Sequence, residues 1–175
     1  MSIQIRETLL SEEAIRSRVR ELADRISRDH AGHEVLLVGV LRGAFMFLAD
    51  LVRELRVPSK IDFIAVSSYG QGIESGAVRL IMDLREDIAG RHVILVEDIV
   101  DSGRTLAYLR EMLSARHPAS LQICALVRKP DCLKRDVSVD YLGFDLPNVW
   151  VVGYGLDCMD EHRGLPYIAA VEVTG

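Results

Sequence analysis

The chain has 175 residues, of which 49% are hydrophobic and 27% are charged. This composition is typical of a globular protein and excludes a disordered chain or a coiled coil. At roughly 150 residues per domain, the length predicts a single domain over residues 1–175. The 21 Lys and Arg residues and 26 Asp and Glu residues give a net charge of −5, which argues against binding nucleic acid through bulk charge.

The three cysteines, Cys124, Cys132 and Cys158, are not spaced as CxxC pairs, so zinc-binding and thioredoxin-type motifs are not supported. Three thiols without such pairing suit the reducing cytosol. Residues 1–7 contain no apolar signal core, and the longest nearly apolar window, residues 35–49, is shorter than the roughly 20 residues that span a bilayer. We therefore expect a soluble, cytoplasmic protein that does not contact membranes.

The first predicted element is a helix from residue 11 to about residue 27. Ser11 is a favourable N-cap, and Glu12 and Glu13 occupy the first turn, where the helix dipole favours acids. An apolar stripe with helical spacing follows, formed by Ile15, Val19, Leu22 and Ile26.

Strands and helices then alternate along the chain. Strands are expected at residues 35–40, 61–67, 93–96 and 121–127, and helices at residues 43–55 and 104–116. The apolar run at 35–40 is rich in β-branched residues, as in strands buried on both faces. This alternation predicts an α/β fold with an open, mainly parallel twisted sheet and helices on both faces.

The last third of the chain has a different pattern. It contains short extended pieces at residues 139–144 and 149–152 and no convincing long helix. We interpret it as a small C-terminal cap, or hood, on the sheet. The core is expected over about residues 33–128, with the hood formed by about residues 129–175 and the N-terminal segment.

Ligands of open α/β sheets bind beyond the carboxyl ends of the strands, and the residues after the strand at 93–96 suggest chemistry there. Glu97 and Asp98 are adjacent acids that suit a sugar diol or a metal ion. The turn that follows supplies backbone N–H groups at a helix N-terminus, and Ser102, Gly103 and Thr105 favour a phosphate. The segment predicts a ribose 5-phosphate site, and the alternative is an acidic strand end before a capped helix.

Residues 97–105, Glu-Asp-Ile-Val-Asp-Ser-Gly-Arg-Thr, look like the phosphoribosyl pyrophosphate signature of type I phosphoribosyltransferases. More narrowly, the chain resembles bacterial hypoxanthine phosphoribosyltransferases from about residue 35 to 168. The supporting motifs, in the order and spacing of that family, are Leu41-Arg42-Gly43, Ser67-Ser68-Tyr69-Gly70, Lys129-Pro130, and Val151-Val152-Gly153-Tyr154-Gly155 with Asp157.

The resemblance implies the type I phosphoribosyltransferase fold and a purine salvage activity. Hypoxanthine and guanine, which are 6-oxopurines, would react with 5-phosphoribosyl 1-pyrophosphate to give IMP and GMP plus pyrophosphate. Mg²⁺ is the implied cofactor, and a homodimer or homotetramer is the implied assembly. The transition state should have oxocarbenium character, so positioning and charge stabilisation matter most.

The resemblance also assigns the ribose and 5-phosphate site. Glu97 and Asp98 would hold the ribose hydroxyls, directly or through magnesium. Asp101 would act as general base at the purine imidazole edge, a role open to a carboxylate within hydrogen-bond reach. The phosphate loop comprises Asp101, Ser102, Gly103, Arg104 and Thr105. The alternative for Asp101 is a purely structural N-cap of the following helix.

Leu41, Arg42 and Gly43 resemble the family's pyrophosphate loop, where a cis peptide bond is often present. Arg163 occupies the position of a pyrophosphate-contacting arginine. Asp157 would join Glu97 and Asp98 as a magnesium ligand on the pyrophosphate side. The alternative for Arg42 is a surface arginine that leads into a helix.

For the base, the resemblance implies that Lys129 donates to the purine 6-oxo group and so disfavours adenine. Trp150 lies where the family places the stacking aromatic residue, which is more often Phe or Tyr, and Val149 and Asp157 are the other implied base-binding residues. The backbone of Val151 would accept from the 2-amino group of guanine. The alternatives are a solvated Lys129 and a Trp150 buried in the core.

Ser68 and Tyr69 begin a glycine-rich segment that runs to residue 76, and the resemblance makes it a mobile lid that excludes water. Its glycines do not match a dinucleotide-binding motif, because the third is one residue late. His30 and His33 have HxxH spacing but no evident third metal ligand.

Two other functions remain open. One is a regulator on the same fold that senses nucleotides and binds RNA or DNA, although the acidic composition and the lack of a basic run disfavour it. The other is a xanthine-preferring phosphoribosyltransferase.

Overall fold

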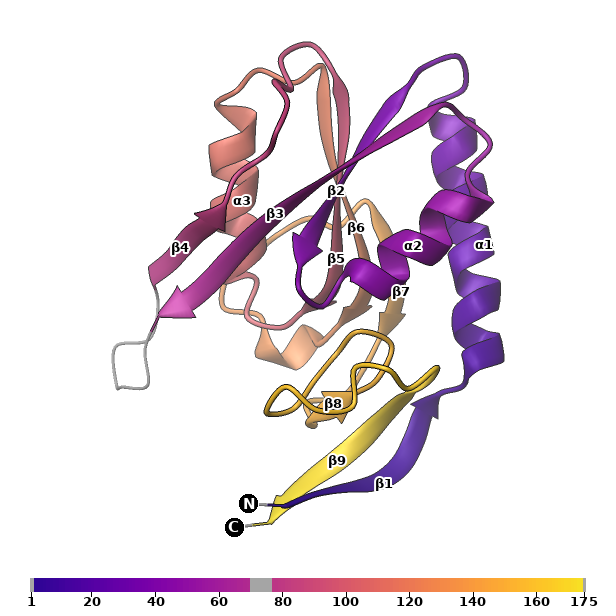
Figure 1. The fold of residues 1–175 in the computed structure, drawn as a ribbon, viewed down its shortest axis with the longest axis vertical. Coiled ribbons are helices and arrows are strands. Elements are labelled where there is room, and N and C mark those ends of the chain that lie inside the picture. The colour runs from indigo at the N-terminus through magenta and orange to yellow at the C-terminus, as the bar shows by residue number, and fades with distance from the viewer. Residues whose placement is uncertain (1, 70–76, 175) are drawn as a thin grey trace.

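The protein is described here by a computed structural model that covers residues 2–69 and 77–174. In these residues a six-stranded sheet has the order β4-β3-β2-β5-β6-β7 (Figure 1). Its strands are β2 (Val35–Leu41), β3 (Ser59–Tyr69), β4 (Ala77–Met82), β5 (His92–Val100), β6 (Ser120–Arg128) and β7 (Tyr141–Asp145). All neighbouring pairs are parallel except β3 with β4, so the predicted mainly parallel sheet is confirmed.

Helices cover both faces of this sheet, as the alternation predicted. Helices α1 (Glu12–Asp29) and α2 (Phe45–Glu54) pack on one face, where Leu37 of β2 and Ile94 of β5 contribute to the core. Helix α3 (Arg104–Ser114) packs on the other face with Val38 and Leu95. Alternate residues of a strand point to opposite faces, so the continuous apolar runs of β2 and β5 serve two cores.

The hood is built on a second sheet of three strands in the described part of the chain, β1 (Ser2–Leu10), β9 (Ile168–Thr174) and β8 (Val151–Val152). They pair antiparallel, and Figure 1 shows them beyond the carboxyl ends of the main sheet. A short 3-10 helix, η1 (Pro130–Cys132), follows β6. The N-terminal and C-terminal segments of the chain therefore share one small sheet.

Several predicted boundaries were wrong by a few residues, and one of these differences affects the site. The strand expected to end at Val96 continues to Val100, so Glu97 and Asp98 lie within β5 rather than in the loop after it. The reason is tertiary: β5 keeps its pairing with β6 up to Val100 and Arg128. Strands β1 and β9 were not predicted, because they pair with partners far away in the sequence.

No helix in residues 2–69 and 77–174 is both long and apolar enough to cross a membrane.

Helix α1 begins as predicted, with the Ser11 hydroxyl accepting a hydrogen bond from the Ala14 N–H at 3.1 Å. We expect Ser11→Ala to lower the free energy of unfolding by about 1 kcal/mol, because it leaves a helix N–H group without its side-chain acceptor. Urea unfolding measures this change. Ser17→Ala, at an exposed position inside the same helix, is the control and should be neutral or slightly stabilising. Equal losses for both variants would contradict the capping role.

Candidate active site

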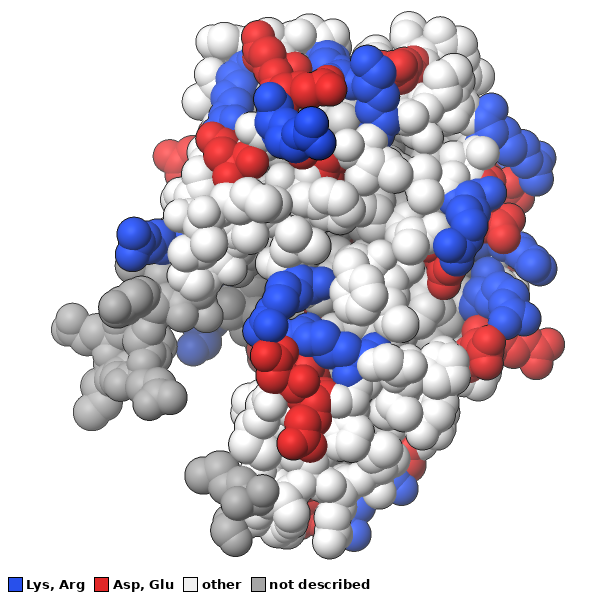
Figure 2. Space-filling view, in the orientation of Figure 1, with Lys and Arg blue, Asp and Glu red and all other residues white. Residues whose placement is uncertain are grey.

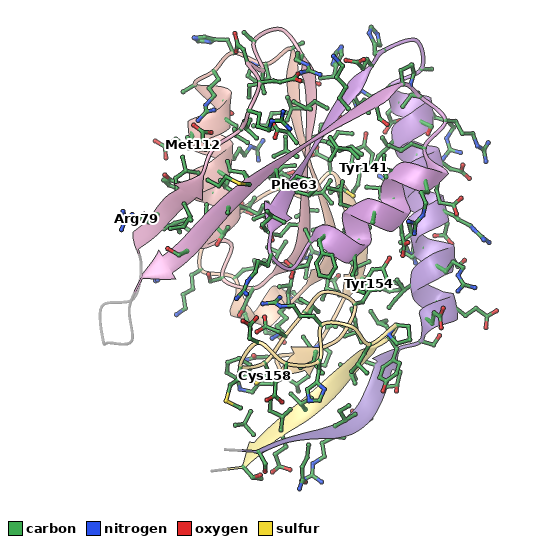
Figure 3. The ribbon with its side chains drawn as sticks, in the orientation of Figure 1. Phe63, Arg79, Met112, Tyr141, Tyr154 and Cys158 are labelled. Atoms are coloured by element: carbon green, nitrogen blue, oxygen red, sulfur yellow. The ribbon has the colours of Figure 1, made fainter. Side chains whose placement is uncertain are left out.

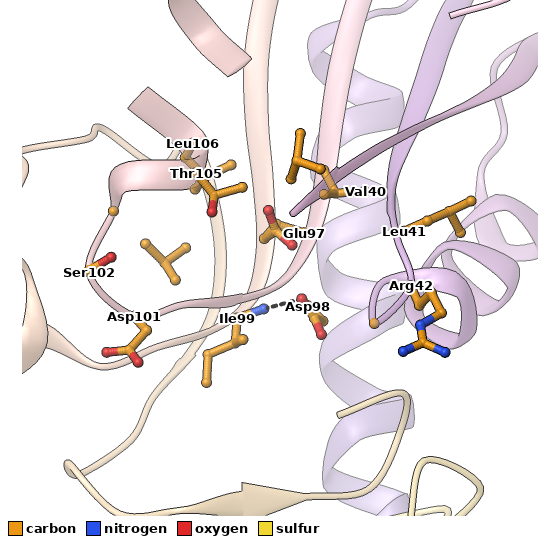
Figure 4. A pocket seen from close by; sticks show the side chains of 14 residues that line it. Val40, Leu41, Arg42, Glu97, Asp98, Ile99, Asp101, Ser102, Thr105 and Leu106 are labelled. Carbon is orange, nitrogen blue, oxygen red and sulfur yellow. Dashed lines mark hydrogen bonds between the residues drawn. The ribbon is translucent and has the colours of Figure 1, made fainter. Parts of the chain in front are cut away.

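A cavity of about 270 Å³ opens at the carboxyl ends of β2 and β5 (Figure 4). Two predicted segments line it, residues 40–43 and residues 97–103, together with Thr105 and Leu106. They are far apart in the sequence and meet because β2 and β5 are adjacent parallel strands. This edge is where open α/β sheets bind their ligands.

The two acids on β5 are buried at the edge of this cavity. Glu97 is 6% exposed and Asp98 is 8% exposed. Burial raises the pKa of both carboxyl groups, and the charge of Asp98 raises that of Glu97 further. Asp98 accepts from the Ile99 N–H at 2.9 Å, whereas Glu97 Oε2 has no hydrogen-bond partner. A buried carboxylate oxygen without a partner is costly, and ligand hydroxyl groups or a cation would satisfy it.

The loop of residues 41–43 lies directly against Asp98. A Cβ atom on Gly43 would overlap the Asp98 carboxylate, so only glycine allows this approach. The peptide bond between Leu41 and Arg42 is cis, as the resemblance suggested. Arg42 is exposed, and α2 begins only two residues after Gly43.

The predicted phosphate loop is a tight turn between β5 and α3. Gly103 is the N-cap of α3 and has a left-handed backbone with φ of 75°. Asp101 therefore does not cap α3, and the purely structural alternative for it was wrong. The carbonyl oxygen of Ser102 accepts from the N–H groups of Lys134 and Arg135 at 3.0 and 3.2 Å, which holds the turn against the segment after η1.

Asp101 is exposed and lies beside two residues that follow β6. The Lys129 N–H donates to the carbonyl oxygen of Val100 at 2.9 Å, which brings the start of η1 next to the end of β5. The thiol of Cys132 lies against Asp101, and its partial burial and this carboxylate raise its pKa. Sequence reasoning missed Cys132 at this position, since nothing local indicates which strand end it approaches.

None of the predicted base-binding residues lines the 270 Å³ cavity, although Lys129 directly follows the end of β6. Lys129 is only 7% exposed, so it is not the solvated lysine of the alternative interpretation. Trp150 is 66% exposed and is therefore not a core tryptophan. Val149 is also exposed, whereas Val151 is buried in β8.

In the hood, Arg163 is held by acceptors from its own loop. Its guanidinium donates to the carbonyl oxygen of Gly155 at 2.7 Å and pairs with Asp157 at 2.7 Å and Asp160 at 3.0 Å. Asp160 also pairs with Arg42 at 3.0 Å, and hydrogen bonds from Arg163 and then Arg42 lower its pKa. Asp160 thus ties the hood to the predicted pyrophosphate loop, a role the sequence did not indicate.

Ser68 and Tyr69 end β3. The remainder of the predicted lid, residues 70–76, and the side chains of Ser68 and Tyr69 lie outside the described residues.

The HxxH histidines lie at the opposite, amino end of the sheet. His92, which sequence reasoning did not connect with them, brings its ring centroid to 5.6 Å from that of His30 and 4.6 Å from that of His33. His30 is hydrogen-bonded to Gln122 at 2.7 Å. Within the described residues no cluster of three or more His, Cys, Asp or Glu side chains could hold a metal ion by itself.

The buried acids predict an unusual pH dependence of stability. A carboxyl group with a raised pKa stabilises the folded state only while protonated, so its contribution is complete below the ordinary Glu pKa of 4.5 and is lost as the pH rises through the folded-state pKa. We therefore expect Glu97→Gln to gain stability relative to the natural chain as the pH rises above 4.5. Urea unfolding in acid and near neutral pH measures this difference.

Asp145→Asn is the control of opposite sign, because a two-pronged hydrogen bond from Arg128 lowers the Asp145 pKa. It should lose stability near neutral pH and lose less in acid. If the stability difference between Glu97→Gln and the natural chain does not change with pH, the raised pKa of Glu97 is wrong.

Comparison with known proteins identifies the family. A model of the phosphoribosyl transferase domain matches residues 6–158. The hypoxanthine-guanine phosphoribosyltransferase of Mycobacterium tuberculosis is 46% identical over 175 residues, covering 96% of this chain and 87% of that protein. The hypoxanthine phosphoribosyltransferase of Salmonella typhimurium is 46% identical over 168 residues, covering 94% of each.

A crystal structure of a hypoxanthine-guanine phosphoribosyltransferase from Bacillus anthracis is similar with a TM-score of 0.92 at 43% identity, covering 98% of this chain and 100% of that chain. One from Staphylococcus aureus, a hypoxanthine phosphoribosyltransferase, gives a TM-score of 0.92 at 40% identity, with coverage of 96% and 92%. The chain therefore belongs to the phosphoribosyltransferase family, and it follows the hypoxanthine and hypoxanthine-guanine members over nearly its whole length.

Proposed function

We propose that this chain converts hypoxanthine and guanine, with 5-phosphoribosyl 1-pyrophosphate, to IMP and GMP plus pyrophosphate. The observation that carries the proposal is one cavity with three complementary walls. These are a buried acid pair for ribose hydroxyls, a left-handed turn at a helix N-terminus for a phosphate, and a glycine loop for a diphosphate. The relatives that match nearly the whole chain bear names of this activity.

Each wall suits one part of the sugar substrate. The carboxylates of Glu97 and Asp98 accept hydrogen bonds from hydroxyl groups, which would satisfy the unpaired Glu97 oxygen. The N–H groups of the turn at 102–105 lie at the N-terminus of α3, where a phosphate would bind. When the sugar substrate is held at these three points, its anomeric carbon is oriented for attack by the purine base. Positioning would then supply much of the rate enhancement.

Magnesium fits the donors of this site. Glu97, Asp98 and Asp157, the last of which also pairs with Arg163, would hold it; burial raises the pKa of the first two, and a cation would favour their charged forms. Mg²⁺ prefers oxygen ligands and is often bound by one or two carboxylates plus substrate phosphates, so an incomplete protein site is expected. When bound, the ion neutralises negative charge on the leaving diphosphate.

Asp101 is suited to take the proton from the imidazole edge of the purine. It is exposed directly after β5 and does not cap a helix, so its carboxylate, which the Cys132 thiol also contacts, is accessible to a ligand. Lys129 and Trp150 would bind the base through its 6-oxo group and its ring face, and the Val151 backbone would read the purine edge. The Lys129 ammonium would be left without an acceptor by adenine, which has an amino group at that position.

The rival proposals are a nucleotide-sensing regulator that binds RNA or DNA and a xanthine-preferring transferase. On the face that Figure 2 shows, Lys and Arg side chains are interspersed with Asp and Glu, which does not favour the regulator. A homodimer or homotetramer remains our expectation from the resemblance.

The proposal is tested by supplying 5-phosphoribosyl 1-pyrophosphate and Mg²⁺ with hypoxanthine, guanine, xanthine or adenine in parallel, and measuring nucleotide formation. We expect product from hypoxanthine or guanine and none from adenine, since Lys129 requires an acceptor. Product only from xanthine would support that alternative. No turnover by folded protein with any base would reject the enzyme and favour the regulator.

For the general base, we expect Asp101→Asn to lower kcat by about 10²–10⁴-fold, because the amide cannot accept the purine proton. Steady-state kinetics with hypoxanthine measures this loss. Asp131→Asn is the matched control, because Asp131 is an exposed acid in the neighbouring η1. A kcat of Asp101→Asn close to that of the control would exclude the base role of Asp101.

A further inference from the structure

The hood meets the predicted pyrophosphate loop through bare backbone at Gly155. A Cβ atom on Gly155 would overlap the carbonyl oxygen of Gly43, and Gly155 has a φ of 98°. Two residues earlier, Gly153 has a φ of 101° and is packed equally closely against the Tyr167 carbonyl oxygen. The backbone of residues 153–155 is thus packed between Tyr167 of the hood and Gly43 of the predicted pyrophosphate loop.

Tyr154, between these two glycines, carries the side chain that joins the hood to the main sheet layer. It is 7% exposed, and its hydroxyl donates to Asp50 Oδ2 at 2.5 Å. Figure 3 shows Tyr154 at the junction of the hood with α2, the helix that holds Asp50 and starts two residues after Gly43. Burial, followed by the hydrogen bond to Asp50, raises the Tyr154 pKa, so the hydroxyl remains a donor at physiological pH.

A second tie between the same two parts is weaker. Arg42 and Asp160 pair at 3.0 Å, but their side chains are 68% and 55% exposed. Exposed ion pairs contribute little, whereas a hydrogen bond from the buried Tyr154 hydroxyl to a carboxylate contributes more, even though the Asp50 side chain is 40% exposed. Tyr154 and Leu156 also pack in the apolar core with α1 and α2, and of the two polar ties the Tyr154–Asp50 hydrogen bond is the stronger.

We propose that the Tyr154–Asp50 hydrogen bond is a clasp that sets the spacing between the loop of residues 41–43 and Asp157. Tyr154 and Asp50 are positioning residues, since they act through Gly155 and Gly43 rather than by touching substrate. The inference rests on the proposed function in one respect, namely that this loop and Asp157 face the diphosphate and its Mg²⁺.

The clasp should affect only one side of the proposed site. Asp157 lies two residues beyond Gly155, so loss of the Tyr154–Asp50 hydrogen bond changes the side that would bind the diphosphate. The base side is held separately, because Val151 and Val152 pair with Ala170 and Ala169 of β9. Loss of the clasp should weaken binding of the diphosphate and magnesium while leaving binding of the purine nearly unchanged.

Tyr154→Phe tests this, because it removes the hydroxyl and keeps the ring. We expect KM for 5-phosphoribosyl 1-pyrophosphate and the Mg²⁺ concentration for half-maximal rate to rise about three- to tenfold, since one hydrogen bond from a buried hydroxyl to a carboxylate is lost. KM for hypoxanthine should stay within about twofold, because base contacts are untouched.

Tyr141→Phe is a matched control. Tyr141 is also buried, and its hydroxyl donates at 2.9 Å to Asp29 on α1, away from the site. Both variants should lose thermal stability. Only Tyr154→Phe should raise KM for 5-phosphoribosyl 1-pyrophosphate and the Mg²⁺ concentration for half-maximal rate. Equal rises of KM for both substrates, or the same kinetic change in Tyr141→Phe, would overturn the clasp.

Changes at Asp50 give a second, independent check. Asp50→Ala should reproduce the kinetics of Tyr154→Phe, and Asp50→Asn, which keeps an acceptor oxygen, should restore part of the loss. The double variant Tyr154→Phe/Asp50→Ala should be no worse than Asp50→Ala alone, because that change already removes the Tyr154 hydrogen bond, together with the exposed Asp50–Arg53 pair. Fully additive losses would contradict the pairing.

Binding of magnesium pyrophosphate, measured by calorimetry, separates this inference from the proposed function. If the natural chain shows no turnover with any base but binds magnesium pyrophosphate about three- to tenfold more tightly than Tyr154→Phe, the function fails and the clasp stands. If the natural chain binds it no more tightly than the variant, the clasp is wrong whatever the activity.

Discussion

The buried carboxylates of Glu97 and Asp98 are the constraint around which the site is arranged. Placing two adjacent acids on a central parallel strand removes them from water, and the rise in both pKa values reflects that cost. One oxygen of Glu97 remains without a partner in the protein. The sheet therefore holds, at its carboxyl edge, negative charge that hydroxyl groups or a cation from the substrate side can compensate.

Two glycines allow the backbone to pack closely above these acids, first in the loop of residues 41–43 and then in the hood. Gly43 allows the loop of residues 41–43 to lie on Asp98, and Gly155 allows the hood to lie on Gly43. A side chain at either position would separate the layers. The left-handed Gly103 serves a different purpose, because it turns the end of β5 into α3 and directs that helix N-terminus at the cavity.

Local patterns predicted the elements whose signals are local. The cap at Ser11, the stripe of α1 and the apolar runs of β2 and β5 were visible in the sequence, and the ordered motifs indicated which strand ends form the site. Strands β1 and β9 were missed because each is the other's main partner across the whole chain. The end of β5 was placed too early, because acids usually end a buried strand, whereas pairing with β6 extends it. The pairs Tyr154–Asp50 and Arg42–Asp160 also could not be predicted, since only the folded chain brings them together.

The relation between the two sheets explains why a clasp is needed. The hood strands β1, β8 and β9 pair only among themselves in the described chain, so no backbone ladder links them to the main sheet. Contact between Gly155 and Gly43 sets a shortest distance but, being only van der Waals contact between backbones, does little to resist separation. The directional hydrogen bond from the buried Tyr154 hydroxyl to Asp50 adds to the packing of Tyr154 in the main core, and would supply that resistance on the proposed diphosphate side of the site.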